Sequence, residues 1–301
     1  MASEEQFDVV IIGAGWYGLI AATTYLRLAP LTKLLILDNG RSMGGVWSKE
    51  RIYPNLFAQV GHGLFEYSFY PMKKEGLTPD RYISGNTIHG YLNDFAKDHD
   101  LVRRTRLNTT VTNIEKADDG MWQLDIKNAD GIKTEKLIVA SGGSSDPHTP
   151  SWPKENFNQP IIHSAQVGTS LETLQSPTTD RVVVLGAAKS AYDTVFLLLK
   201  AGKKVDWIIR EDGSGPLAIM PPRILGIFNT VDVMATRALA SFSPALLNTS
   251  GIWYKLLHKT RIGRAFTMGF WRNLTRAAEH HADYNKTENS KKLRPIPSGY
   301  G

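Results

Sequence analysis

A short apolar run near the start of the chain, followed at once by three spaced glycines, constrains the fold more than any other feature. Residues 7–12 read FDVVII, and Gly13, Gly15 and Gly18 follow them. A near-continuous apolar run is typical of a parallel strand that is buried on both faces. Glycines at this spacing permit a tight turn, a close approach of the backbone to a pyrophosphate and close packing of the next helix. The sequence therefore predicts the strand, turn and helix of a dinucleotide-binding α/β fold.

A second apolar run, Leu34–Leu37, ends on Asp38. The unpaired N–H groups and the dipole at the start of a helix bind phosphate without a basic side chain. An acid at the end of the second strand is placed to accept hydrogen bonds from an adenosine ribose. If the glycines formed only an ordinary turn, the position of Asp38 at the end of the second strand would be a coincidence. We therefore predict a dinucleotide cradle here.

The segment after Asp38 carries a family resemblance. Gly44 and Gly45 precede Trp47 by a few residues. Paired glycines let the backbone pass against a flat ring system, and a tryptophan offers that ring a stacking face, although Trp47 taken alone also fits a core position. With its acid, short loop and Gly-Gly-x-Trp, the chain resembles the flavin-containing (class B) monooxygenases and their Baeyer–Villiger relatives. Residues 48–72 resemble the fungal branch of that family.

The resemblance implies FAD in the first cradle. Residues 137–142 read LIVASG and match the stretch at which such proteins leave the flavin domain. His163 lies on the spacing of the family's Phe-x-Gly-x3-His-x3-aromatic fingerprint, but Gln159 replaces the glycine and Val167 the aromatic residue. By itself His163 fits a hydrogen-bonded structural role as well as the implied hinge role. The residues expected to bind this cofactor are Gly13, Gly15, Gly18, Asp38, Gly45, Trp47, Val111, Ala140 and Gly142.

A second cradle follows in residues 182–191, which read VVVLGAAKSA, and its second strand leads to Arg210. An acid at that position would repel a 2′-phosphate, whereas a guanidinium pairs with one, so Arg210 favours NADPH over NADH. Ala188 replaces the middle glycine, and its methyl group would crowd the pyrophosphate. The residues expected to contact NADPH, besides His163 at the hinge, are Gly186, Lys189, Ser190 and Arg210.

The resemblance also implies a reaction in which NADPH reduces FAD and the reduced flavin activates O2 to oxygenate a small organic substrate. Gln59 lies where the family often places an asparagine near the flavin edge. Its amide can stabilise the oxygenating species, and an ordinary surface position explains Gln59 equally well. We therefore predict an FAD-dependent, NADPH-using monooxygenase of fungal secondary-metabolite biosynthesis. The alternatives are a truncated, non-catalytic paralogue that binds flavin or a partner chain, and a flavin oxidase or dehydrogenase.

Composition narrows these choices. The sequence contains no cysteine, which excludes the flavoprotein disulfide reductases because they need a redox-active thiol pair. No apolar stretch reaches the roughly 18 residues of a membrane span, and the first strand starts too early to leave space for a signal peptide. We expect a cytoplasmic protein. His280 and His281 are adjacent and point to different helix faces, so no metal site is expected.

The expected fold class is α/β, with two dinucleotide-binding (Rossmann-like) domains in the three-layer FAD/NAD(P)-binding arrangement. We place the FAD-binding domain at residues 1–153, a partial NADPH-binding-like domain at 154–215, and a helical insert with the C-terminal tail at 216–301. Relative to the family the chain looks shortened at its C-terminus. Two strands do not form a stable covered sheet, so the second domain needs the insert, a second copy or a partner chain at its open edge.

The net charge of +6 comes partly from the insert, which alternates apolar residues at helical spacing with basic ones. A substrate lid or a packing insert explains this pattern, and a basic amphipathic stretch also fits contact with a membrane surface. We expect no nucleic-acid partner, because no segment matches a nucleic-acid-binding module.

Overall fold

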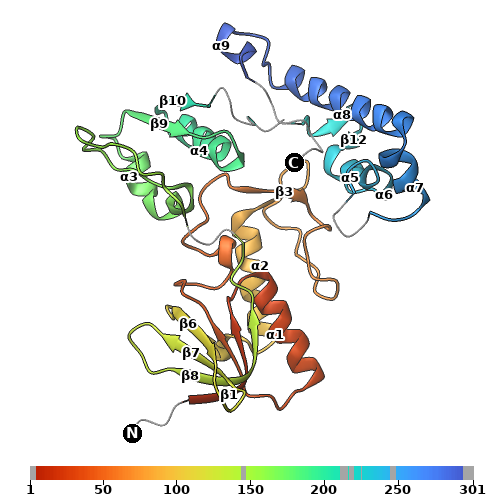
Figure 1. The fold of residues 1–301 in the computed structure, drawn as a ribbon. Helices are drawn as coiled ribbons and strands as arrows, with labels where there is room; N and C mark the ends of the chain where they lie inside the picture. The colour runs from red at the N-terminus through yellow and green to blue at the C-terminus, as the bar shows by residue number, and fades with distance from the viewer. Residues whose placement is uncertain are drawn as a thin grey trace. The chain divides into compact units, whose positions relative to one another are not determined.

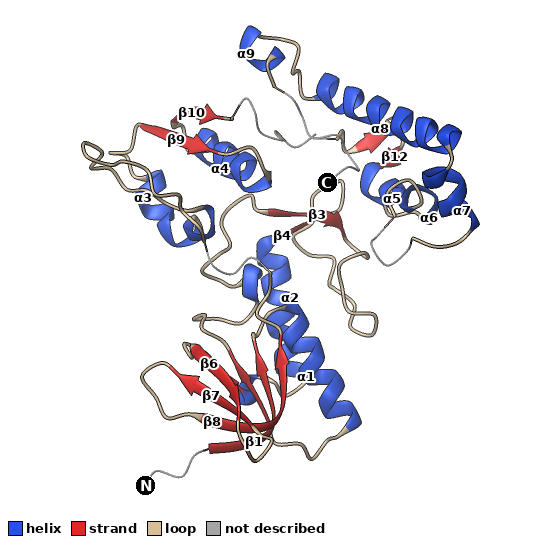
Figure 2. Cartoon of the chain, viewed as in Figure 1, coloured by secondary structure: helices blue, strands red, loops and turns tan. Residues whose placement is uncertain are grey.

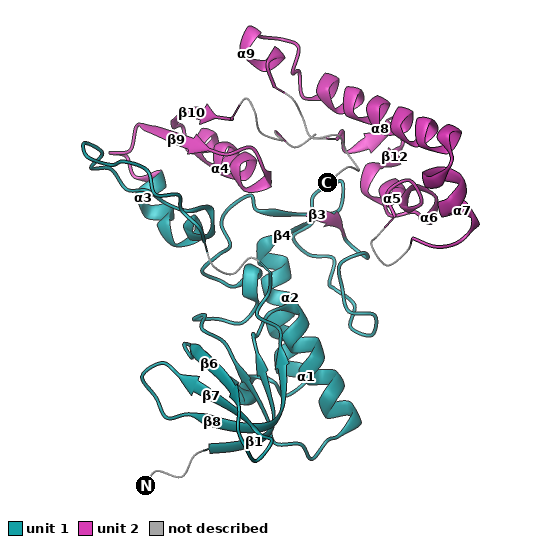
Figure 3. Ribbon diagram, in the orientation of Figure 1, with its two compact units in different colours: residues 1–58, 62–174 teal, residues 59–61, 175–301 magenta. Residues whose placement is uncertain are grey.

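The chain divides into two compact units, which Figure 3 colours separately. Unit 1 comprises residues 1–58 and 62–174, and unit 2 comprises residues 59–61 and 175–301. The computed structural model describes residues 5–143, 147–210, 216, 220–224, 226–244 and 249–293. The last part of the predicted C-terminal tail, residues 294–301, lies outside the described residues. The domain boundaries expected at residues 153 and 215 stay predictions.

Unit 1 is built on a six-stranded sheet in the order β5-β2-β1-β8-β7-β6 (Figure 1). β5, β2, β1 and β8 run parallel, and β8, β7 and β6 form an antiparallel meander. The predicted parallel sheet is confirmed. The elements that begin in this unit are β1 (Glu5–Ile12), α1 (Trp16–Leu28), β2 (Leu34–Leu37), η1 (Gly45–Trp47), β3 (Phe57–Gly61), β4 (Tyr82–Ser84), α2 (Gly85–Asp98), η2 (Val102–Arg104), β5 (Thr105–Arg106), β6 (Val111–Lys116), β7 (Trp122–Ile126), β8 (Ile132–Val139), η3 (Ser164–Gln166), η4 (Gly168–Ser170) and α3 (Leu171–Gln175).

Both faces of the parallel sheet are buried, as the unbroken apolar run of β1 predicts. Val9 and Ile11 point into a core cluster with residues of α1 and α2, and both are fully buried. Val10 points the other way, into a cluster that also includes Phe7 and Leu124 of β7. The meander therefore folds back over one face of the sheet while the helices cover the opposite face, which holds the carboxyl end of β1 rigid.

A buried tyrosine fastens α2 to the segment before it. The Tyr91 hydroxyl donates to the Tyr70 carbonyl oxygen at 2.7 Å and accepts from the Tyr67 N–H at 2.7 Å. Burial raises the pKa of Tyr91 to about 12. The hydroxyl therefore stays protonated and keeps both bonds across the physiological pH range. Ser84 caps the same helix, its Oγ accepting from the Thr87 N–H at 3.1 Å.

Unit 2 begins with a second strand–helix–strand segment, in which β9 and β10 pair in parallel. Within the described residues this sheet has two strands, and Val183, Leu185 and Ile208 are 58, 51 and 51% exposed. The remainder of the unit is mostly helical, as Figure 2 shows. Its elements are β9 (Arg181–Leu185), α4 (Lys189–Lys200), β10 (Lys204–Ile208), β11 (Arg223–Ile224), β12 (Phe228–Asn229), α5 (Thr230–Met234), α6 (Arg237–Ala240), α7 (Ile252–Tyr254), the π-helix η5 (Lys255–Lys259), α8 (Arg261–His281) and α9 (Glu288–Lys291).

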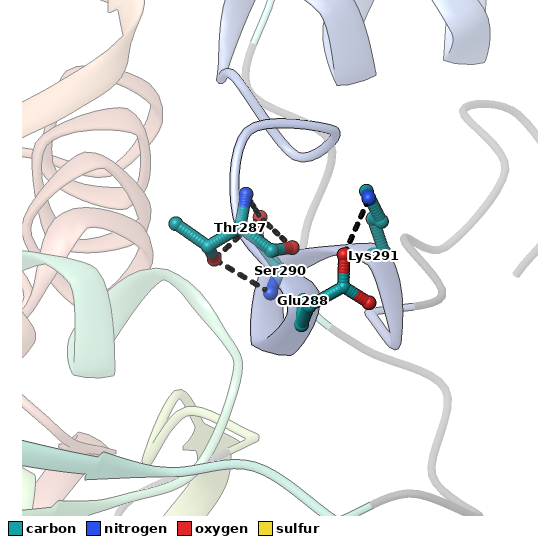
Figure 4. A network of polar contacts seen from close by, with 4 residues as sticks. All are labelled: Thr287, Glu288, Ser290 and Lys291. Carbon is teal, nitrogen blue, oxygen red and sulfur yellow. Dashed lines mark hydrogen bonds and ion pairs between the residues drawn. The ribbon is translucent and has the colours of Figure 1, made fainter.

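Two contacts fix the later part of unit 2. The hydroxyls of Tyr192 in α4 and Tyr284, just after α8, hydrogen-bond to each other, and the Tyr192 ring lies edge-on to Trp207 at 4.7 Å. The short α9 is closed by a capping box in which Thr287 and Ser290 exchange side-chain to backbone bonds of 3.0 and 3.1 Å (Figure 4). The Tyr192–Tyr284 bond ties the end of the helical segment back to the second cradle, and the capping box fixes the start of α9.

In the part of the chain that the structure describes, no helix combines the length and apolar character needed to cross a bilayer. The same residues contain no cluster of His, Cys, Asp or Glu side chains suited to a metal ion.

Candidate cofactor site

A cavity of about 530 Å³ lies in unit 1 at the carboxyl ends of β1, β2 and β8. This is the edge at which parallel α/β sheets bind ligands, and the volume is within the range of small-molecule sites. Four of the residues predicted to bind the cofactor line it, namely Gly13, Asp38, Val111 and Gly142. They come from four separate segments, so the fold brings together residues that are far apart in the sequence.

The structure explains glycine at two of the three positions of the first cradle and not at the third. Gly13 has a φ of +109°, and a Cβ there would overlap the carbonyl of Ala140. A Cβ at Gly18 would overlap the Gly13 carbonyl oxygen. Gly15 differs, because its φ is −85° and a Cβ would only touch the Gly45 Cα at 3.5 Å, an ordinary contact. The fold itself therefore requires glycine at 13 and 18 and leaves position 15 open to a side chain.

Asp38 is held by backbone groups on both of its oxygens. Oδ2 accepts from the Ala14 N–H at 2.6 Å, and Oδ1 accepts from the Gly40 N–H at 2.7 Å. These bonds join the end of β2 to the turn after β1, a role that the sequence did not reveal. Each carboxylate oxygen retains a further lone pair, so the predicted bond to a ribose hydroxyl remains open to it.

The Gly-Gly-x-Trp segment lies against the cradle. The Gly44 N–H donates to the Ala14 carbonyl oxygen at 3.0 Å, and Gly45, at a φ of +60°, faces Gly15. Trp47 ends η1 half-buried, with its ring edge-on to Phe65 at 6.1 Å. The backbone of this segment is thus positioned by the cradle turn, whereas the indole also belongs to the core.

The cavity is also lined by polar residues that the sequence analysis did not predict to bind the cofactor. They are Asn39, Thr109, Thr110 and Ser141. The Thr109 N–H donates to the Asp38 carbonyl oxygen at 2.9 Å, which brings the start of β6 beside the end of β2. No motif marks Thr109 and Thr110, because their position depends on a pairing between segments about seventy residues apart.

The second cradle, in unit 2, has the expected strand and helix but different polar contacts. Gly186 has a φ of +126°, and its carbonyl oxygen accepts from Trp207 Nε1 at 2.6 Å. Lys189 opens α4 but forms an ion pair with Asp193 one turn on. Ser190 and Arg210 are exposed, and Arg210 follows the end of β10. Arg210 is thus accessible to a ligand phosphate, while the Lys189 ammonium already has a carboxylate partner.

His163 and Gln59 do not line the cavity either. His163 is the N-cap of η3, where its Nδ1 accepts from the Ala165 N–H at 3.1 Å and its N–H donates to Gln166 Oε1 at 3.1 Å. This is the hydrogen-bonded structural role that was the alternative for His163. Gln59 is exposed on β3, in the stretch assigned to unit 2. The hinge role of His163 and the place of Gln59 beside a flavin stay predictions.

Residues 10–231 match the pyridine nucleotide-disulphide oxidoreductase family. The chain belongs to this family. The match spans both cradles, and because the sequence contains no cysteine, this chain has no counterpart of the disulphide in the family's name.

Among individual family relatives, the chain is 48% identical over 299 residues to the FAD-dependent monooxygenase DEP4 of Alternaria brassicicola. That alignment covers 99% of this chain and 51% of the relative. The FAD-dependent monooxygenase rstn6 of Aspergillus nomiae is 39% identical, with 97% of this chain and 53% of the relative covered. The chain thus spans about half the length of the relatives it matches.

Solved structures agree on the fold of this family member. A steroid monooxygenase bound to NADP superposes with a TM-score of 0.61 at 24% identity, covering 79% of this chain and 44% of that one. A closed cyclohexanone monooxygenase also gives 0.61, at 22% identity, with 73 and 40% covered. The predicted resemblance to flavin and Baeyer–Villiger monooxygenases is confirmed.

Proposed function

We propose that the cavity of unit 1 binds FAD. The observation that carries this proposal is Gly15, where the fold tolerates a side chain and the sequence nevertheless has none. A pyrophosphate that passes the start of α1 would explain the glycine at position 15, because it needs the space that a Cβ would occupy. In this proposal Gly13, Gly15 and Gly18 form the phosphate turn, Asp38 faces the ribose, and Gly45 and Trp47 lie on the flavin side. Val111, Ala140 and Gly142 complete the wall.

We further propose that the chain is the flavin-bearing part of an NADPH-using monooxygenase that oxygenates a small organic substrate in fungal secondary metabolism. Its support is the name of the fungal relatives and the fold shared with an NADP-bound monooxygenase. When bound, FAD would supply the electron transfer and oxygen activation. The protein residues orient the cofactor and keep water from it, and the buried faces of the β1 sheet make that orientation rigid.

The second cradle is proposed to receive NADPH, with domain limits at residues 153 and 215. Gly186 forms its turn, and Lys189 and Ser190 begin the helix that faces the pyrophosphate. Arg210 is proposed to pair with the 2′-phosphate, because it is exposed and follows the end of β10. Ala188, the N-cap of α4, limits how closely the pyrophosphate approaches.

Replacing Arg210 with alanine is expected to weaken NADPH binding about ten- to a hundredfold and to leave NADH nearly unchanged. Loss of a charge-assisted hydrogen bond typically costs about 1.5 to 3 kcal/mol. Titration of both cofactors into the purified chain measures this. Arg181→Ala is the matched control, because Arg181 is also exposed but pairs with Asp206 across the β9–β10 ladder. Equal losses of affinity for NADPH and NADH would show that Arg210 has a structural role and does not bind the 2′-phosphate.

The proposed function is tested by the absorbance spectrum of the purified chain. We expect a flavin spectrum after purification or after added FAD, bleaching by NADPH without oxygen, and recovery when O2 is admitted. Protein that stays colourless with excess FAD would refute the cofactor assignment. Bleaching with recovery but no oxygenated product from a panel of ketones and sulfides would favour an oxidase or dehydrogenase.

A further inference from the structure

The helical part of unit 2 has an uneven charge. Between Asp232 and Glu279 the sequence has no acidic residue. The same stretch carries seven basic ones, Arg237, Lys255, Lys259, Arg261, Arg264, Arg272 and Arg276. Within the described residues, none of the six from Lys255 to Arg276 forms an ion pair with a carboxylate, and all seven basic residues are exposed. The segment is therefore a solvent-facing cationic surface.

Apolar side chains are exposed on the same segment. Ile252 and Trp253 of α7 are 79 and 69% exposed, and Leu256, one turn further on, is 50% exposed. Ile262 and Phe266 of α8, also one turn apart, are 84 and 61% exposed. Residues three or four apart are neighbours on a helix surface, so these side chains form adjacent groups. Large apolar groups concentrated on a surface mark an interaction site.

In α8 the usual pattern of a surface helix, with large apolar residues buried and polar residues exposed, is partly reversed. Its buried residues are mostly small or polar, namely Gly263, Thr267, Trp271, Thr275 and Ala278. A Cβ at Gly263 would overlap the Leu256 carbonyl oxygen, so α8 packs closely on η5 through a glycine. The small residues let the helix approach its support, and Ile262 and Phe266 are left facing solvent. Helices α7 and α8 both contact η5, which connects them, so the two exposed apolar groups lie on neighbouring segments.

We propose that this surface, the α7–α8 face, binds an anionic lipid membrane. We define it by Ile252, Trp253, Leu256, Ile262 and Phe266 with the cations Lys255, Lys259, Arg261 and Arg264. Apolar side chains enter the boundary between headgroups and acyl chains, and basic side chains attract anionic headgroups. A second copy of this chain fits less well, because two faces with cations and no acids repel each other. The proposal does not depend on the proposed oxidation chemistry.

Co-sedimentation of the full chain with vesicles tests the proposal. We expect binding to vesicles of phosphatidylcholine mixed with phosphatidylserine, little binding to phosphatidylcholine alone, and loss of binding in high salt. The double variant Lys255→Glu/Lys259→Glu is expected to lower partitioning at least about tenfold, since each basic residue near such a surface is worth about 1 kcal/mol. Trp253→Ser tests the apolar part and is expected to lower partitioning to the mixed anionic vesicles at low salt.

Matched controls come from unit 1. Lys74→Glu/Lys97→Glu makes the same change of net charge at two exposed lysines, and Leu31→Ser removes an apolar side chain that is fully exposed. These variants are expected to bind vesicles as the parent chain does. Circular dichroism measures whether each variant is folded. Phe266→Ser, at another residue of the α7–α8 face, is used in place of any variant that does not fold. Equal losses in both sets, or equal binding to neutral and anionic vesicles, would overturn the proposal. So would vesicle-independent self-association that the α7–α8 variants abolish.

Discussion

Replacing Gly15 with alanine is expected to weaken FAD binding at least about tenfold, and replacing it with valine is expected to leave the purified protein colourless. The physical reason is that a side chain at this position would project into the space proposed for the pyrophosphate. The fold should tolerate the change, because a Cβ at Gly15 meets only the Gly45 Cα at 3.5 Å. Flavin content after purification and FAD titration by fluorescence quenching measure the effect.

The stability of the apoprotein supplies the control for this experiment. Thermal unfolding of flavin-free Gly15→Ala should lie within about 1 kcal/mol of the parent chain, since the backbone there has an ordinary conformation. Unchanged FAD affinity in a folded variant would show that the cofactor does not pass Gly15. The cavity at the ends of β1, β2 and β8 would then need a different ligand.

Gly18→Ala is expected to lower the free energy of unfolding of unit 1 by about 3 kcal/mol, which corresponds to roughly 6 to 12 °C in Tm. Its Cβ would overlap the Gly13 carbonyl oxygen, which is rigid backbone and has no low-cost way to move. The helix must then move away from the β1 turn, and the buried contacts of α1 are lost. Thermal unfolding without added FAD separates this effect from any loss of ligand.

Gly90→Ala is the matched control, because Gly90 lies inside α2 and a Cβ there meets nothing within 4 Å. We expect this variant to be more stable than the parent by about 0.5 to 1 kcal/mol, since alanine is a better helix former than glycine. A Gly18→Ala protein as stable as the Gly90→Ala protein would contradict the packing described for α1.

Local pattern was sufficient to predict the first cradle. The apolar runs 7–12 and Leu34–Leu37 became β1 and β2 because strands buried on both faces have a distinctive composition. The helix predicted to follow Gly13, Gly15 and Gly18 is α1, Trp16–Leu28. Each of these elements depends on residues that are close in sequence.

The partners of polar side chains were not predictable in this way. Asp38 was expected to face a ligand, and the structure adds two bonds to backbone amides that only the folded turn supplies. Lys189 was expected to face a phosphate, and it is paired with Asp193, a contact that helical spacing permits but does not require. Thr109 and Thr110 reach the cavity only because β6 starts beside β2. Side-chain partners and exposure require the tertiary structure.

The bond between Tyr192 and Tyr284 affects the order in which the chain matures during synthesis. The sheet of unit 1 pairs strands up to residue 139, so it can close while the rest of the chain is still being made. The helix of the second cradle is fastened by a residue 92 positions later. Since synthesis proceeds at about 5 to 20 residues per second, α4 waits several seconds for its partner. During that interval α4 is held in place by its contacts with β9 and β10.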